Sequence, residues 1–295
     1  TNIRMDIFRK HIEIIKESKI SFISPKEFSE KFYISKDKKK VLLTIDDGFT
    51  SFYQNAWPYL KKNNIPFILF ISTEAVGKSG YMSWDQILEI EKENIGYIGN
   101  HSHSHNYLVE NDLGIFKKDI KKSIKIFKSK LGYNPVFFSY PFGEYSLEQE
   151  NFISKNFLFA FGQNSGVIDI NKEKFELPRF PINEKYGDLK RFKNVINYLP
   201  LQYKSMKPKN KLLTKNNNPP KMFIEFFEEQ KNLTNINCYS NEENKWKKSK
   251  TIIEKNVLII EFRQKFNFRR GRINCSLNDS EGWRFAGFQF SNKLN

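Results

Sequence analysis

The sequence predicts an α/β protein whose first two thirds form a parallel β-sheet covered by helices, followed by a smaller all-β region. Three observations lead to this fold class. Up to about residue 200, short apolar runs alternate with segments whose apolar residues recur at helical spacing. Residues 201–220 interrupt the alternation with a polar stretch containing Lys, Asn and Pro, which is typical of a linker. Beyond it, short runs rich in β-branched and aromatic residues favour strands.

The N-terminal alternation can be followed element by element. A helix is expected over 5–18, because Phe8, Ile12 and Ile15 recur at helical spacing. His11 falls off that apolar stripe and is expected to be solvated. The next elements are expected at strand 41–45, helix 52–63, strand 65–71, helix 84–93, strand 95–100, a long helix ending at Gly132, strand 136–140, and apolar segments 157–161 and 177–180. Repeated strand, loop and helix units pack as a parallel sheet with helices outside.

Residues 221–295 are predicted to form a small β-sandwich. A candidate strand covers 257–262, and the runs 272–276 and 283–290 are typical of a hairpin. Two roles are open for this part: a glycan-binding module whose exposed aromatic rings stack on sugars, or a packing domain whose aromatic rings form a core. The packing role is favoured. The chain is therefore expected to divide into a barrel domain 1–200, a linker 201–220 and an accessory domain 221–295.

The strongly basic composition allows two explanations. The formal net charge is +16, with 49 Lys and Arg against 33 Asp and Glu. Such a charge can serve an anionic polymer, but only nine of these residues are Arg, and a surface rich in Lys and Asn also arises from codon bias. Codon bias is the favoured explanation, and no nucleic-acid partner is expected. One local exception is a group of five arginines near the C-terminus: Arg263, Arg269, Arg270, Arg272 and Arg284.

Other global features add little to the functional prediction. The chain has no run of about 18 apolar residues, so no transmembrane segment is expected. It begins at Thr1, so we expect an upstream segment. Cys238 and Cys275 are too few for a zinc cluster, and their spacing neither requires nor excludes a disulfide. The sequence does not indicate an oligomeric state.

The most informative stretch is Thr-Ile-Asp-Asp-Gly at 44–48, directly after the apolar run 41–43. Two adjacent carboxylates repel each other and are costly at the end of a buried strand. A bound cation removes this cost if Asp47 becomes a ligand and Asp46 stays free as a base. The alternative is a solvated turn, because Asp-Asp-Gly is also ordinary turn chemistry.

A second cluster contains three of the four histidines of the chain, within 101–105. Imidazole is the commonest neutral metal ligand. His101 and His105 are four residues apart, so one helical turn would direct both toward one ion. With Asp47 they would form a two-His, one-carboxylate set that leaves a coordination position open. The alternative is a polar loop in which histidines cluster by chance.

A third segment completes a pattern of motifs. Thr-Ile-Asp-Asp-Gly at 44–48, His-Ser-x-Ser-His at 101–105 and Tyr-Pro-Phe-Gly at 140–143 resemble, in order and spacing, the motifs of the polysaccharide deacetylase family, the group that shares the NodB homology domain. A softer match is Leu-Pro-Arg-Phe at 177–180. The resemblance covers about residues 5–200 and implies a distorted (β/α) barrel with about seven strands.

The resemblance also implies an activity and a cofactor. It predicts a hydrolase that removes N-acetyl groups from amino sugars of a polysaccharide or oligosaccharide. One divalent ion is implied, zinc with cobalt or nickel as alternatives, held by Asp47, His101 and His105. An O-acetyl esterase, and a catalytically impaired glycan-binding protein on the same scaffold, stay open as alternatives. A bacterial cell envelope location is favoured over the cytoplasm.

The remaining site residues follow from the same resemblance. Asp46 would be the general base, and Arg179 would orient it, although a structural salt bridge explains Arg179 nearly as well. The turn formed by Tyr140, Pro141 and Phe142 would contact the substrate, and a backbone N–H near Phe142 would stabilise the oxyanion.

Two departures from the family pattern affect these expectations. Many members carry Arg where this chain has Ser139, and many carry a late His that protonates the leaving amine, whereas no His follows His105. In members similar to poly-N-acetylglucosamine deacetylases, the acidic His lies on an N-terminal strand just before a helix like 5–18. The resemblance therefore predicts either that this barrel lacks its first strand and its proton donor, or that the protein has no such donor.

Overall fold

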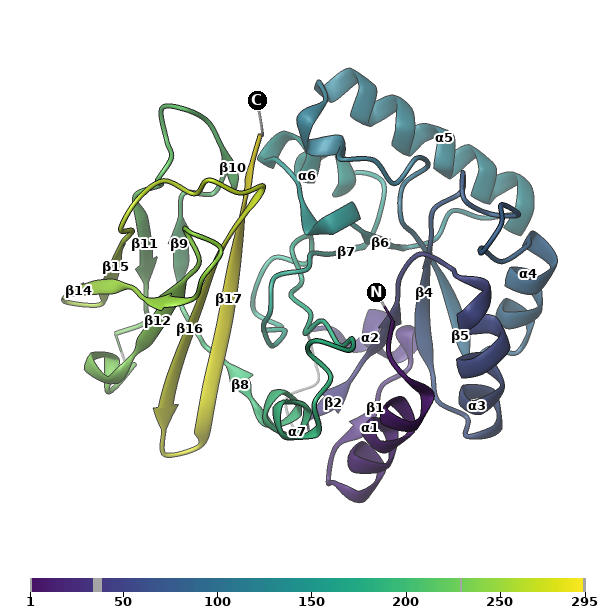
Figure 1. Ribbon diagram of the computed structural model, residues 1–295, viewed down its shortest axis with the longest axis horizontal. Helices are drawn as coiled ribbons and strands as arrows, with labels where there is room; N and C mark the ends of the chain where they lie inside the picture. The colour runs from purple at the N-terminus through teal and green to yellow at the C-terminus, as the bar shows by residue number, and fades with distance from the viewer. Residues whose placement is uncertain (1, 34–38, 229, 294–295) are drawn as a thin grey trace.

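The computed structural model describes residues 2–33, 39–228 and 230–293. It consists of a helix-rich part built on a parallel sheet and a β-rich part beside it (Figure 1). The helices are α1 (Met5–Glu17), α2 (Pro25–Lys31), α3 (Trp57–Lys62), α4 (Trp84–Lys92), α5 (Leu113–Leu131), α6 (Leu147–Ile153) and α7 (Leu189–Asn197). None of the helices in the described part of the chain is long and apolar enough to cross a membrane.

The helix-rich part is organised around five parallel strands in sequence order: β3 (Leu43–Ile45), β4 (Phe67–Ile71), β5 (Gly96–Asn100), β6 (Phe137–Ser139) and β7 (Phe159–Phe161). This confirms the α/β class predicted for residues up to about 200. Because all five strands run the same way, their carboxyl ends share one edge of the sheet.

The sheet is open and has fewer strands than the seven of the expected barrel. Its flanks carry only short additions. Strand β1 (Ser21–Phe22) pairs in parallel with β2 (Lys40–Val41). A single residue separates β2 from β3. On the other flank, Leu177 makes a single parallel bridge to Phe161 of β7. These segments are too short to continue the ladder, so the described residues form a half-barrel.

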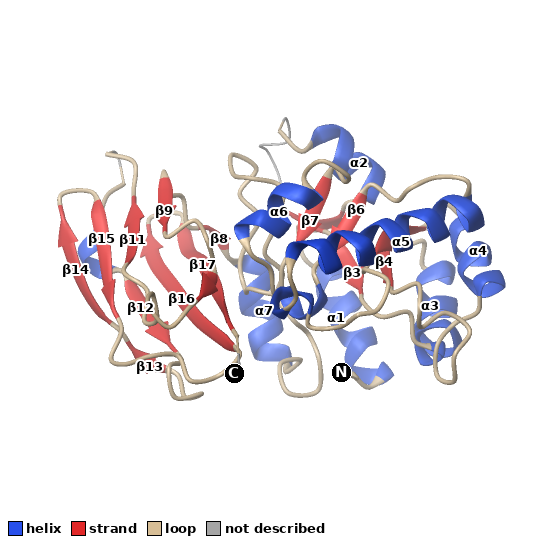
Figure 2. Cartoon of the chain, turned by 90° about the horizontal axis from the view of Figure 1, so that it is seen from above, coloured by secondary structure: helices blue, strands red, loops and turns tan. Residues whose placement is uncertain are grey.

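Strand β4 lies at the centre of the core and is buried along its whole length. Successive side chains of a strand point to opposite faces. Phe67 and Leu69 pack with α3 and α4, whereas Ile68 and Phe70 join a second cluster that contains Phe28 of α2. Helices α3 and α4 therefore cover one face of the sheet, while Phe28 of α2 packs on the opposite face; Figure 2 shows the strands among these helices.

His11 contradicts the expectation of a solvated side chain. It is 2% exposed, its Nε2 lies 2.7 Å from the carbonyl oxygen of Gly187, and its ring stacks on Phe192 with centroids 4.0 Å apart. The physical reason is α7, which covers the flank of α1 that the helical periodicity assigned to solvent.

The C-terminal part contains two sheets. One has the order β10-β17-β16-β12-β13, with β8 on β17, and the other has the order β14-β15-β11-β9. The strands are β8 (Leu199–Pro200), β9 (Ser205–Lys207), β10 (Leu212–Leu213), β11 (Met222–Glu225), β12 (Asn237–Ser240), β13 (Lys247–Lys248), β14 (Lys250–Glu254), β15 (Val257–Glu261), β16 (Arg270–Asp279) and β17 (Gly282–Asn292). Both sheets contribute to one hydrophobic cluster, which contains Phe226, Phe266, Phe288 and Phe290.

One sequence expectation about this part changes, and one question that the sequence left open is answered. Residues 201–220 contribute β9 and β10 to the two sheets instead of forming a separate linker. Cys238 and Cys275 lie directly opposite each other on β12 and β16, and they form a buried disulfide. Strand β17 lies on the side of the β-rich part that faces the helix-rich part (Figures 1 and 2).

Candidate metal centre and active site

The predicted site residues come from one edge of the parallel sheet. Asp46 and Asp47 follow β3, and His101 follows β5. Arg179 lies two residues beyond Leu177, which bridges to the end of β7. The parallel strands thus bring together side chains that are far apart in the sequence.

Asp47, His101 and His105 form a compact group of potential metal ligands, with one ligand atom of each within 4.8 Å of the others. The two Nε2 atoms are 3.2 Å apart, and Oδ1 of Asp47 lies 3.3 Å from His105 Nε2 and 3.6 Å from His101 Nε2. Ligands bound tetrahedrally at roughly 2.0–2.1 Å from zinc are about 3.3–3.4 Å apart. The spacing of the three side chains therefore fits one ion of this kind.

The His101 ring is fixed in the tautomer that a metal ligand needs. Its Nδ1 lies 2.7 Å from the carbonyl oxygen of Ser139, so Nδ1 carries the hydrogen and Nε2 keeps a free lone pair. The ring is fully buried, and burial lowers its pKa because the charged imidazolium is disfavoured away from water. His101 is thus held neutral with Nε2 directed at His105 and Asp47.

The two histidines meet through a loop and not through the helical turn that their spacing suggested. Residues 101–105 contain no helix. Ser102 and His105 instead adopt positive φ angles of 71° and 53°, which turn the chain back on itself. The hydroxyl of Ser102 accepts the backbone N–H of His105 and stabilises this turn.

Unusual backbone geometry concentrates at the site. Positive φ is uncommon for residues other than Gly and Asn, and such strain often marks functional positions. Among the described residues, nine non-glycine residues have positive φ, and four of these are Asn. Four of the other five are Asp47, Ser102, His105 and Phe142.

Several supporting residues were not identified from the sequence. Asp119 of α5 accepts the backbone N–H groups of His103 and Ser104, at 2.8 and 3.1 Å. Asn100 accepts the N–H of Ser102. A single Asp or Asn with no motif around it gives no sequence signal, because its role depends on which loop the fold places beside it.

His103 lies outside the ligand group. Its Nδ1 is 2.9 Å from the hydroxyl of Thr73, and it does not belong to the set of three convergent side chains. The structure therefore separates the middle histidine of the motif from the two on either side of it.

Asp46 is held separately from Asp47, by Arg179. The guanidinium donates to both carboxylate oxygens of Asp46, and to the hydroxyl of Ser139 at 2.9 Å. Burial alone would raise the pKa of Asp46, but the charge and hydrogen bonds of Arg179 oppose burial and help hold that pKa below its usual range. Asp46 is therefore an ionised carboxylate of fixed orientation, and Ser139 supports Arg179.

The three residues of the aromatic turn differ in what they can offer. The N–H of Tyr140 donates to the carbonyl oxygen of Phe161, and its side chain is fully buried. Pro141 has no N–H. Phe142 adopts a φ of 59°, and its ring packs edge-on against His105 with centroids 4.8 Å apart. Of the three, only Phe142 combines a backbone N–H with direct contact to the candidate ligands.

A stack of side chains connects Phe142 to the C-terminal part. Tyr107 stacks on Phe142 with ring centroids 4.1 Å apart, and it is 39% exposed. The guanidinium of Arg269, on the segment before β16, lies 3.6 Å from the centre of the Tyr107 ring. Both parts of the chain thus contribute to the surroundings of the site.

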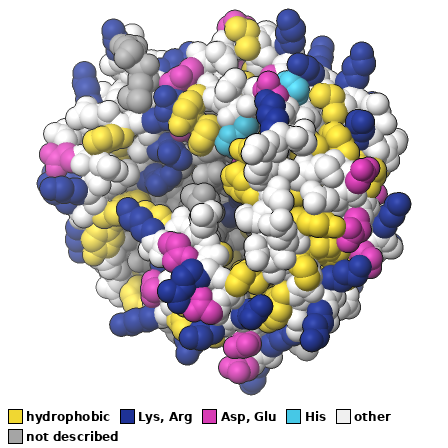
Figure 3. All heavy atoms as spheres, turned by 45° about the vertical axis from the view of Figure 1, so that its right-hand side comes forward, with side chains coloured by type: hydrophobic (Ala, Val, Ile, Leu, Met, Phe, Trp, Pro, Cys, Tyr) yellow, Lys and Arg dark blue, Asp and Glu magenta, His cyan; other side chains and the backbone are white. Residues whose placement is uncertain are grey.

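The C-terminal arginines are engaged in contacts within the protein. Each of the five contacts a different polar side chain. Arg263 pairs with Glu242, Arg269 with Glu110, Arg270 with Glu144, Arg272 with Gln289 and Arg284 with Asp279. On the face shown in Figure 3, Lys and Arg side chains are interspersed with Asp and Glu.

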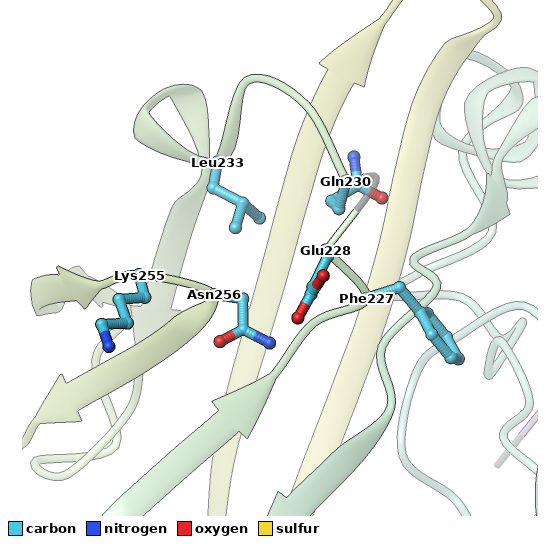
Figure 4. Close-up of a pocket in the computed structure, with 6 residues that line it drawn as sticks. All are labelled: Phe227, Glu228, Gln230, Leu233, Lys255 and Asn256. Carbon is cyan, nitrogen blue, oxygen red and sulfur yellow. The ribbon is translucent and has the colours of Figure 1, made fainter.

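The C-terminal part also carries a pocket of about 290 Å³ (Figure 4). It lies between the end of β11 and the turn that joins β14 to β15, and is lined by Phe227, Glu228, Gln230, Leu233, Lys255 and Asn256. The pocket shares no residue with the candidate metal site. The exposed Phe227 ring keeps a glycan-binding role of this part open as a prediction.

The motifs and this geometry agree with a comparison to known sequences. Residues 34–156 match the sequence model of the polysaccharide deacetylase family. Over these residues the chain is similar to a polysaccharide deacetylase domain. The Bacillus subtilis protein YxkH, whose name assigns it to polysaccharide deacetylases, is 29% identical over 147 residues, which are 48% of this chain and 51% of YxkH. A Staphylococcus aureus poly-beta-1,6-N-acetyl-D-glucosamine N-deacetylase is 27% identical over 194 residues, 60% of this chain and 66% of the relative. The chain therefore spans between half and two thirds of these relatives.

Solved structures share the fold of the helix-rich part of the chain. The Streptococcus pyogenes deacetylase PplD has a TM-score of 0.60 and 22% identity, covering 66% of this chain and 87% of PplD. IcaB from Ammonifex degensii has a TM-score of 0.58 and 22% identity, covering 66% of this chain and 89% of IcaB. At this level of identity the likeness concerns the fold.

Proposed function

We propose that this protein is a metal-dependent N-deacetylase that acts on acetylated amino sugars of a glycan. The observation that carries the proposal is the separation of two neighbouring carboxylates into different roles. Asp47 faces His101 and His105, whereas Asp46 is bound by Arg179. A hydrolase needs both a ligand set and a free base, and a purely structural ion site would need only the first.

Asp47, His101 and His105 would hold the ion. A divalent ion bound there would lower the pKa of the attacking water and polarise the acetyl carbonyl. The residues of the chain account for the other requirements. Asp46, ionised and fixed by Arg179, accepts a proton from the attacking water. The N–H of Phe142 lies in the strained turn that contacts His105, where it can donate to the oxyanion that develops on the acetyl group.

A second candidate activity is hydrolysis of O-acetyl esters. All four histidines of the chain lie in described segments, and none outside the ligand group is free to protonate a leaving amine there. His11 is enclosed by α1 and α7, and His103 is bonded to Thr73. An alkoxide leaves more readily than an amine, so an ester needs less help from an acid.

The substrate class follows from the relatives. The Staphylococcus aureus relative is named for poly-beta-1,6-N-acetyl-D-glucosamine. We therefore propose an N-acetylglucosamine oligomer as the first substrate to test.

The test measures acetate release from N-acetylglucosamine oligomers and from an O-acetylated xylan, with the protein loaded with zinc, cobalt or nickel. Release from the oligomers that stops on chelation and returns with metal is expected. Release from the xylan alone would favour the esterase. Metal-loaded protein that releases no acetate from either substrate would contradict the proposed hydrolase.

A further inference from the structure

A side chain of the C-terminal part reaches into the candidate active site. Gln289 lies on β17, 146 residues beyond the aromatic turn, and its side-chain amide donates to the carbonyl oxygen of Gly143 at 2.8 Å and to that of Phe142 at 3.2 Å. The side chain is buried, with 5% of the residue exposed. One amide group thus binds two successive carbonyl groups of the turn that carries the Phe142 N–H.

The orientation of the Gln289 amide is fixed from its other side. Arg272 lies directly opposite Gln289 on β16, and its Nε donates to Gln289 Oε1 at 3.1 Å. Arginine can only donate, so the oxygen of the amide must face Arg272. The amide nitrogen must therefore face the two carbonyl groups.

The turn requires an external restraint. Phe142 and Gly143 have φ angles of 59° and 67°, and a Cβ on Gly143 would lie 2.4 Å from the backbone nitrogen of Gln163. Strained conformations persist when surrounding contacts over-determine them. A buried carbonyl without a partner is costly, so the bonds from Gln289 favour this conformation.

A second contact from the C-terminal part reinforces the first. Arg269 lies over Tyr107, which stacks on Phe142, and the guanidinium also pairs with Glu110 at 2.5 Å. The turn is therefore held through its ring by Arg269 and Tyr107, and through its carbonyl groups by Gln289.

We propose that Gln289 is a positioning residue for the deacetylation reaction, and that the C-terminal part completes the active site by fixing the Phe142–Gly143 turn. This inference rests on the function proposed above. It assigns to β16 and β17 a role in forming the oxyanion site, beyond packing or sugar binding.

The test compares Gln289→Met, Gln289→Glu and Asn164→Ala. Methionine is similar in size and cannot donate, and Gln289→Glu keeps the partnership with Arg272 while placing an acceptor against two carbonyl oxygens. Asn164→Ala is the matched control, because Asn164 also bridges the two parts with a side-chain amide, to the carbonyl oxygen of Gly287 at 2.9 Å.

Gln289→Met and Gln289→Glu should lower kcat at least about tenfold with little change in KM, since misplacing a catalytic group by about 1 Å can cost 10²-fold. Asn164→Ala should remain close to wild type.

A double-mutant cycle tests the route from Arg272. Arg272→Met should lower kcat by less than Gln289→Met, and the double variant should be no worse than Gln289→Met alone. Additive losses would overturn the proposal that Arg272 acts through Gln289.

Hydrogen exchange separates this inference from the proposed function. The Gly143 and Glu144 N–H groups are bonded within the turn, to Tyr140 and Pro141. Their exchange should accelerate at least about tenfold in the metal-loaded Gln289 variants and not in Asn164→Ala. Unchanged exchange would overturn the inference whether or not the wild type is active. If exchange accelerates in the Gln289 variants but the metal-loaded wild type releases no acetate, only the proposed function would be overturned.

Discussion

Arg179 binds Asp46 with both arms of its guanidinium, at 2.7 and 2.9 Å, across 133 residues of sequence. The two oxygens of this carboxylate are thereby engaged on one side, while the neighbouring Asp47 faces the histidines. The backbone makes this division through the φ of 77° at Asp47. Adjacent acidic residues can then have different surroundings and different chemistry.

Replacing Arg179 should impair the reaction without removing the metal. Arg179→Lys keeps the charge but loses the bidentate geometry, so Asp46 should lose its fixed orientation. We expect kcat to fall about 10- to 100-fold, with an unchanged metal content by elemental analysis. Arg191→Lys is the control, because Arg191 binds backbone carbonyl groups of Pro181 and Tyr186 outside the site. Metal loss in Arg179→Lys would show that the guanidinium supports the ligands instead.

The two aspartates should respond differently to the same substitution. Asp46→Asn should keep the metal and lose about 10²–10⁴-fold in rate, because an amide cannot accept the proton of the attacking water. Asp47→Asn should weaken metal binding, because it removes the one charged ligand. Titration with zinc and initial-rate measurements on both variants would test this. A near-wild-type rate for Asp46→Asn would remove Asp46 from the mechanism.

The histidines offer an internal comparison. His105→Ala should lose most of the bound ion, since it removes one of three convergent ligands. His103→Ala should retain it, because His103 is bonded to Thr73. Metal-to-protein ratios after dialysis would measure both. A stoichiometric ion in His105→Ala would contradict the proposed ligand set.

Gly143 should be more sensitive to substitution than other glycines with positive φ. Gly143→Ala adds a Cβ that would lie 2.4 Å from the Gln163 nitrogen, whereas Gly77, with a φ of 81°, has no atom within 4 Å of such a Cβ. Gly77→Ala therefore isolates the cost of the backbone conformation, about 1–2 kcal/mol. Urea unfolding should show a larger loss of stability for Gly143→Ala. Equal losses would mean that the turn can shift to accommodate the side chain.

Glu144 should make the stability of the protein depend on pH. Burial raises the pKa of its carboxyl to about 7, although Arg270 and Arg269 act in the opposite direction. Between the unfolded value of 4.5 and about 7, the folded protein binds more protons, so the contribution of Glu144 to stability falls as pH rises. The difference in unfolding free energy between wild type and Glu144→Gln should therefore change across this range and level off above it. A difference that is constant between pH 4.5 and 8 would indicate an ordinary carboxyl pKa.

The sequence by itself predicted the α/β class and the residues that the structure places at one edge of the sheet. It could do so because motifs at the ends of parallel strands must meet, however far apart they are along the chain. Local pattern was also sufficient for the end of α5, because Gly132, which was expected to end this helix, is its C-cap with a φ of 83°.

Only the tertiary structure decided how these residues are held. The sequence spacing of His101 and His105 suggested a helix, but Ser102 and Asp119 stabilise a loop instead. His11 is buried because α7 packs on α1 and because Gly187, 176 residues along the chain, lies against its ring. Gln289 gave no signal at all, because an isolated glutamine in a strand is ordinary until another part of the chain supplies two carbonyl groups for its amide. Such contacts depend on packing between distant segments, which local periodicity and motif spacing do not encode.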